Sequence, residues 1–175
     1  MSQFTDKIIW ITGATSGIGE ALAYALSEKG AKLILSARRV EELERVKSNC
    51  KGEAVLLPLD LSKMQEFELL TQKVITHYGR IDYLINNGGI SQRSEAFETP
   101  LELDRKIMEV NYFGNIALTK AVLPQMQKQK SGTIVVISSL SGKFGFFLRS
   151  AYSASKFALV GFYESLRLEE EKNDI

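Results

Sequence analysis

The chain has 175 residues, of which 45% are hydrophobic and 25% are charged, and its formal net charge is +1. This length and composition suit one soluble domain with a sizeable core, and the small net charge argues against a nucleic-acid partner held by bulk electrostatics. No apolar run is long enough to span a membrane, and a single histidine and a single cysteine exclude a metal site built from those residues and an internal disulfide.

The start of the chain has the pattern of a phosphate-binding turn. Four consecutive apolar residues, Ile8 to Ile11, predict a buried strand, and three glycines follow it in the spacing G-x-x-x-G-x-G before a helical segment. Gly13 lets the chain turn sharply, Gly17 leaves room for a pyrophosphate, and Gly19 lets helix and strand pack closely. The N–H groups of the helix start then face the phosphates. A plain tight turn is the alternative for this pattern.

Strands and helices are expected to alternate along the rest of the chain. We expect strands at 7–12, 32–36, 53–59, 82–86 and 132–138, and helices at about 17–29, 40–50, 62–78, 100–130 and 151–171. Gly30 should end the first helix, Ser62 should N-cap the third, and the fourth helix should carry an early irregularity. This α/β pattern predicts a doubly wound parallel sheet with strand order 3-2-1-4-5, whose ligand binds at the switch point between strands one and four.

The end of the second strand favours one nicotinamide cofactor over the other. Enzymes that prefer NAD place an acidic residue here to bind the ribose 2′-hydroxyl. Ala37 stands at that position and is followed by Arg38 and Arg39, and guanidinium groups suit a 2′-phosphate. These residues therefore predict NADP(H), with solvated charges that open the next helix as the alternative.

Two further strand ends carry short polar or small residues. Asp60, after the third strand, can hold a ligand or cap the next helix together with Ser62, and both roles can coexist. After the fourth strand, Asn87, Gly88 and Gly89 tolerate positive φ and allow close approach of a ligand. A bare turn is the alternative for this second segment.

A tyrosine and a lysine one helical turn apart carry the candidate chemistry. Tyr152 and Lys156 share a face of the last expected helix. A free tyrosine has a pKa of about 10 and is a poor base near neutrality, but a nearby ammonium group lowers that pKa, so that Tyr152 can exchange a proton with a substrate oxygen. Ser139, just past the fifth strand, can bond a substrate carbonyl. A plain surface contact is the alternative for a Tyr-x-x-x-Lys pair alone.

Together with Asn111 and the glycine spacing, these residues resemble the classical short-chain dehydrogenase/reductase family, in its steroid/retinoid-type, member 7-like branch. The resemblance implies a single Rossmann-type NADP(H)-binding domain over residues 1–175. It implies hydride transfer between the nicotinamide and a secondary alcohol or ketone, with Tyr152 as general acid/base and Ser139 orienting the substrate. Asn111 would support a water that links Lys156 to solvent.

The resemblance also implies which residues hold the cofactor. Asp60 and the backbone of Leu61 would hold the adenine, and Lys156 would bond the nicotinamide ribose. The cofactor-binding residues expected in this way are Gly13, Thr15, Ser16, Gly17, Ile18, Gly19, Arg38, Arg39, Asp60, Leu61, Asn87, Gly88, Gly89, Tyr152 and Lys156. No metal site is expected.

The chain departs from this family at both ends. Family members continue past the Tyr/Lys helix with two more strands and a Pro-Gly turn that binds the nicotinamide end, and no Pro-Gly follows Lys156 here. We therefore expect a C-terminally truncated domain, and a nucleotide-binding but catalytically inactive protein is the alternative function. Relatives in this branch carry an N-terminal membrane anchor, whereas residues 1–6 show neither an anchor nor a signal peptide, which predicts a cytoplasmic protein.

Two of the expected helices are apolar on more than one side, which calls for a partner. They are residues 104–130 and 151–171, and in the family these helices pair with their copies across a two-fold axis, so we expect a homodimer or homotetramer. The loop 143–150 contains Phe144, Phe146 and Phe147. We expect these rings either to form the wall of an apolar pocket for a small alcohol or ketone, or to pack on the last helix or on a partner chain.

Overall fold

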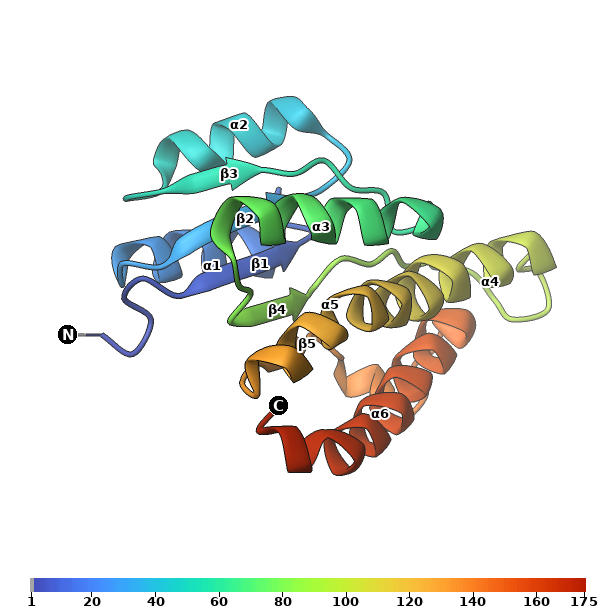
Figure 1. Cartoon of the computed structure of the whole chain (residues 1–175). Coiled ribbons are helices and arrows are strands. Elements are labelled where there is room, and N and C mark those ends of the chain that lie inside the picture. Colours follow the sequence, from blue (N-terminus) through green and yellow to red (C-terminus); the bar gives the residue numbers. More distant parts are fainter. Residues whose placement is uncertain (1) are drawn as a thin grey trace.

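Five parallel strands form one sheet in the order β3-β2-β1-β4-β5, as Figure 1 shows for this computed structural model, which describes residues 2–175. The strands are β1 (Ile8–Thr12), β2 (Lys32–Ser36), β3 (Ala54–Leu56), β4 (Tyr83–Asn86) and β5 (Thr133–Val136). In the middle of the sheet, Trp10 pairs with Ile34 on one side and Leu84 on the other. The predicted strand order and parallel pairing are confirmed. Met1 lies outside the described residues.

Six α-helices cover the two faces of this sheet. They are α1 (Gly17–Glu28), α2 (Val40–Asn49), α3 (Phe67–Tyr78), α4 (Leu101–Met108), α5 (Asn115–Gln129) and α6 (Ser150–Glu170). One apolar cluster joins the sheet to α1 and α2 and includes Ile11, Leu26 and Leu43. A second cluster joins the opposite face to α3 and α5, where Phe67 and Leu118 are buried. Figure 1 shows α6 below the sheet on the side of β5.

The first helix ends at a glycine, as predicted. Gly30 has φ +82°, a conformation that other residues rarely adopt. Its N–H donates to the carbonyl of Ser27 at 3.1 Å, and the N–H of Ala31 donates to that of Leu26 at 3.2 Å. These two bonds are those of a Schellman motif, which turns the chain directly into β2.

The expected start of the third helix is wrong. A short 3₁₀ turn (Met64–Glu66) precedes α3, whose helical conformation begins at Phe67. Ser62 therefore does not cap the helix; its N–H and hydroxyl both donate to Asp60 Oδ1, at 3.0 and 2.8 Å. A serine and an aspartate that satisfy each other in a local turn leave the helix to start later.

The expected helix at 100–130 is divided in two by a π-helical turn. The turn, Glu109–Gly114, is the irregularity that the sequence predicted near the start of this segment. A Cβ built on Gly114 would lie 2.3 Å from the carbonyl oxygen of Leu61. Glycine at this position therefore lets the start of α5 touch the backbone that follows β3.

The longest helix, α6, has 21 residues. Leu159 of this helix is buried, whereas Phe157 is 46% exposed. Phe113, on the neighbouring π-helical turn, is 44% exposed. Phe162 is only half-buried and lies edge-on to Tyr112, with ring centroids 6.3 Å apart. Within residues 2–175, no helix combines the length and the apolar character needed to cross a membrane.

Candidate active site

The glycine-rich turn after β1 has the geometry that its spacing predicts. Gly13 has φ +63°, and a Cβ built on Gly19 would lie 2.3 Å from the carbonyl oxygen of Gly13, so a side chain at Gly19 would collide with the turn. Nothing in residues 2–175 lies within 4 Å of a Cβ built on Gly17. Ser16, the N-cap of α1, makes no side-chain cap bond to the helix. The first N–H groups of α1 therefore face an open space that suits an anion.

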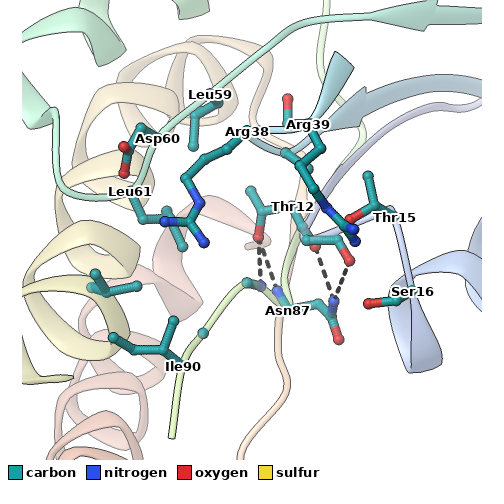
Figure 2. Close-up of a pocket in the computed structure, with 16 residues that line it drawn as sticks. Thr12, Thr15, Ser16, Arg38, Arg39, Leu59, Asp60, Leu61, Asn87 and Ile90 are labelled. Atoms are coloured by element: carbon teal, nitrogen blue, oxygen red, sulfur yellow. Dashed lines mark hydrogen bonds between the residues drawn. The ribbon is translucent and has the colours of Figure 1, made fainter. Parts of the chain in front are cut away.

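One hydroxyl fastens the loop after β4 to the end of β1. Thr12 Oγ1 accepts hydrogen bonds from the backbone N–H groups of Asn87 and Gly88, both at 3.0 Å. The side-chain amide of Asn87 in turn donates to the carbonyls of Thr12 and Gly13, at 3.0 and 3.1 Å. These bonds, drawn as dashed lines in Figure 2, hold two strand ends together at the switch point of the sheet.

A cavity of about 370 Å³ opens between these strand ends (Figure 2). Its lining residues are Thr12, Gly13, Thr15, Ser16, Ser36, Ala37, Arg38, Arg39, Leu59, Asp60, Leu61, Asn87, Gly88, Gly89, Ile90 and Val110. The structure therefore brings most of the expected cofactor-binding residues together in one cavity. Gly17, Ile18 and Gly19 lie in the first turn of α1 beside it, and Tyr152 and Lys156 do not line it.

Basic side chains stand at the mouth of this cavity. Figure 2 shows Arg38 and Arg39 reaching from the end of β2 into the pocket, and both residues are exposed. The turn bonds from Ser62, together with the nearby charges of Arg38 and Lys63, lower the pKa of Asp60. Asp60, Arg38 and Arg39 thus all line the cavity, and the guanidinium groups can receive an anionic ligand.

A further arginine supports the glycine-rich turn from α2. Arg45 donates to both carboxylate oxygens of Glu20, at 2.7 and 3.1 Å, and to the carbonyl of Thr15 at 3.1 Å. The hydrogen bonds from Arg45 and Tyr24 lower the pKa of Glu20 to about 2, so Glu20 carries its charge across the physiological pH range. No local sequence pattern marks Arg45, because only folding brings α2 beside the turn.

The π-helical turn places Asn111 behind the loop that lines the cavity. Its side chain is fully buried; Oδ1 accepts from the N–H of Ile90 at 2.7 Å, and Nδ2 donates to the carbonyl of Ile90 at 2.9 Å. Nδ2 also donates to Ser155 Oγ on α6 at 3.0 Å. Asn111 therefore connects the cavity loop to the helix that carries Tyr152.

Lys156 is buried beside Tyr152 at the end of β5. The lysine is 5% exposed, its Nζ donates to the carbonyl of Ile137 at 2.8 Å, and the same atom lies 5.6 Å from the centre of the Tyr152 ring. Burial lowers the pKa of Lys156 to about 8. Because the ammonium form predominates below that pH, Lys156 can place a positive charge near the Tyr152 ring at neutral pH.

Ser139 follows β5 and begins a short 3₁₀ turn (Leu140–Gly142). Its Oγ accepts from the N–H of Ser141 at 3.1 Å, which leaves the hydroxyl proton to be donated to a ligand. The aromatic residues further along this loop do not face the 370 Å³ cavity. Phe144 and Phe146 pack together with ring centroids 5.0 Å apart, and Phe147 is 84% exposed.

Several residues that shape the site carried no strong sequence signal. Thr12 ends a buried strand with a hydroxyl, a pattern that could have marked it. Gln92 and Ser155 stand among other polar residues, and only the structure shows that both are buried and hydrogen-bonded to the first turns of α6. The positions that the sequence identified are those expected to bind or react, whereas Thr12, Gln92 and Ser155 hold the surrounding backbone in place.

Comparisons with known proteins agree with this architecture. The family model for short chain dehydrogenases matches residues 7–175. Human dehydrogenase/reductase SDR family member 7 is 49% identical over 174 residues, which cover 95% of this chain and 51% of that protein. The dehydrogenase/reductase SDR family protein 7-like of Anopheles gambiae is 49% identical over 181 residues, which cover 99% of this chain and 57% of that protein. The chain spans about half the length of these curated relatives.

Solved structures with the same fold hold different nicotinamide cofactors. A metagenomic short-chain oxidoreductase in complex with NADP has a TM-score of 0.94 and 32% identity, over 98% of this chain and 80% of that chain. NAD⁺-bound xylitol dehydrogenase has a TM-score of 0.96 and 28% identity, over 99% of this chain and 68% of that chain. The fold is therefore compatible with either cofactor.

Proposed function

Because the chain belongs to the short-chain dehydrogenase family of oxidoreductases, we propose that it transfers hydride between NADP(H) and a secondary alcohol or ketone. The observation that carries this proposal is the buried Lys156 beside Tyr152, on a helix that Asn111 ties to the cavity loop. The test is to follow nicotinamide absorbance while the full-length protein is mixed with NADPH and a panel of ketones. Cofactor binding without turnover on any of them would contradict the proposal.

The cavity residues fit a dinucleotide. The glycine-rich turn leaves open space over Gly17, and the N–H groups at the start of α1 suit the pyrophosphate. Asp60 and Leu61 border the far side of the same cavity, where they would hold the adenine. When bound, the nicotinamide ring supplies or accepts the hydride.

The chain's own residues would move the proton. The Tyr152 hydroxyl would donate a proton to the substrate oxygen during carbonyl reduction, and the Tyr152 phenolate would accept one during alcohol oxidation. Lys156 would place its positive charge beside the Tyr152 ring, and the hydroxyl of Ser139 would donate a hydrogen bond to the carbonyl. The partly exposed rings of Phe144 and Phe146 follow Ser139 in the same loop and support an apolar substrate.

Replacing Arg38 should weaken NADP(H) binding and leave NAD(H) binding almost unchanged. In residues 2–175, Arg38 and Arg39 have no carboxylate partner within ion-pair distance, so both can receive a 2′-phosphate. Arg38→Ala should cost about 1.5–3 kcal/mol of NADP(H) affinity, the range for a hydrogen bond to a charged group. Calorimetric titration of the full-length protein with both cofactors measures the difference. Arg167→Ala is the control, because Arg167 is exposed and lies outside the cavity. Tighter binding of NAD(H) than of NADP(H) by the unmodified protein would refute the preference.

Apolar exposure on two neighbouring helices supports a homodimer or homotetramer. Phe113 and Leu101 border a cavity of about 610 Å³ between α4 and the start of α6, and Ala151 and Ala154 form its other side. Further along α6, Phe157 is also exposed. Rings on the surface of adjoining helices favour burial against a second copy of the same surface.

A charge at Phe157 should then split the oligomer. Phe157→Glu places a carboxylate on the proposed contact without disturbing the core, because the ring already faces solvent. Phe162→Glu is less suitable, since Phe162 packs on Tyr112 within the chain. Light scattering at micromolar concentration should report smaller particles for Phe157→Glu and unchanged particles for Leu69→Glu, an exposed residue of α3. A monomeric unmodified protein would rule the assembly out.

A further inference from the structure

The first turn of α6 is capped by a side chain from a distant loop. The N-cap residue of this helix, Arg149, makes no side-chain cap bond to it. Instead Gln92, which is 5% exposed, accepts a hydrogen bond at Oε1 from the backbone N–H of Tyr152 at 3.2 Å. Its Nε2 donates to Ser150 Oγ at 3.4 Å. Tyr152 is the third residue of α6, and a backbone N–H at that position has no partner within its own helix.

The helix in turn holds the loop that contains Gln92. The guanidinium of Arg149 donates to Ser91 Oγ at 2.5 Å and also to the carbonyl of Gln92. Backbone and side chain of Gln92 are therefore both bonded to the start of α6. A glutamine held at both ends has little rotamer freedom, so it fixes the distance between the loop and the helix.

A second set of hydrogen bonds links the backbone carbonyl of Tyr152 to the same loop. Two residues before Gln92, the backbone of Ile90 is bonded through both its N–H and its carbonyl to Asn111. Asn111 donates to Ser155 Oγ, and that hydroxyl donates to the carbonyl of Tyr152 at 2.7 Å. The N–H of Tyr152 is thus held through Gln92 and its carbonyl through Ser155, and both routes meet at the loop that lines the cofactor cavity.

We propose that Gln92 is a positioning residue for Tyr152, which sets where the phenol stands relative to the cavity loop. This inference rests on the proposed function, because Tyr152 must be the proton donor for its placement to matter. Gln92 does not line the cofactor cavity. Its loss should therefore affect the proton-transfer step and leave cofactor binding intact. Small displacements of a reacting group have large effects on rate.

Three variants of the full-length protein test this role. Gln92→Leu removes the acceptor and keeps most of the volume, Gln92→Glu keeps an acceptor oxygen for the N–H of Tyr152, and Gln72→Leu makes the same chemical change on exposed α3. Gln92→Leu should lower kcat about tenfold with little change in KM or in NADPH affinity. Gln92→Glu should recover most of kcat, and Gln72→Leu should match the unmodified protein.

The split between kcat and KM and the rescue by Gln92→Glu separate positioning from a general loss of structure, because a misfolded variant would also lose NADPH affinity. Unchanged kcat in Gln92→Leu would overturn the inference, as would equal losses of kcat in Gln92→Leu and Gln92→Glu. Failure of the proposed function has a different signature: the unmodified protein would bind NADPH without turnover, or Tyr152→Phe would remain active.

Discussion

Tyr152→Phe should abolish turnover in the full-length protein while NADPH still binds. The phenol is the proposed proton donor, and general acid–base catalysis contributes a factor of about 10² to 10⁴ to rate. The ring that stays in the variant preserves the packing beside Lys156, whose Nζ lies 5.6 Å from its centre. Steady-state turnover and fluorescence titration with NADPH measure the two properties separately.

Tyr83→Phe is the matched control for this prediction. In the described residues, the hydroxyl of Tyr83 forms no hydrogen bond, and its ring packs on Phe4 away from the cavity. Loss of a hydroxyl there should leave turnover unchanged. Substantial activity in Tyr152→Phe would refute the role of Tyr152, and an inactive unmodified protein that binds NADPH would favour the nucleotide-binding alternative.

Gly19→Ala should damage both the fold and cofactor binding. The new methyl group would lie 2.3 Å from the carbonyl oxygen of Gly13 and 2.6 Å from the side-chain nitrogen of Asn87. The carbonyl belongs to a turn that is itself bonded to Asn87, so the turn and the loop after β4 must both move. Overpacking of this kind costs about 1–3 kcal/mol of unfolding free energy. Thermal unfolding and NADPH titration should both report the change.

Gly161→Ala makes the same chemical change where space is available. Nothing in residues 2–175 lies within 4 Å of a Cβ built there, and alanine in a helix interior is favoured over glycine by up to about 1 kcal/mol. This variant should unfold at the same or a higher temperature. If Gly19→Ala behaved in the same way, close packing at the glycine-rich turn would not explain the glycine.

The sheet could be predicted from the sequence because its signals are local. Apolar runs such as Ile8 to Ile11 and the glycine at position 30 depend on neighbours within a few residues. The candidate residues could be identified for a similar reason, since Tyr152 and Lys156 are one turn apart on one helix. The predicted strand order places the end of β2 next to the glycine-rich turn after β1. Arg38 follows β2 and therefore lines the same cavity as that turn.

The support around the site could not be predicted in the same way. Gln92 is 60 residues from Tyr152 along the chain, and Arg45 is 30 residues from Thr15, so no local pattern links either pair. The predicted start of α3 is wrong because Ser62 can either cap the helix or bond to Asp60. In the structure its hydroxyl donates to Asp60, and the helix begins later. Competition between a local turn and a helix cap depends on the folded backbone.

The π-helical turn sets the rotational phase between α4 and α5. Each residue advances an α-helix by about 100°, so deleting one residue from Glu109–Gly114 would turn one of the two helices relative to the other. If α5 turned, Leu118 and Val122 would leave the core on that face of the sheet; if α4 turned, Ile107, which is fully buried, would lose its packing. Length changes in this segment are therefore opposed by two independent contacts, whereas substitutions that keep its length can be tolerated only away from Asn111 and Gly114.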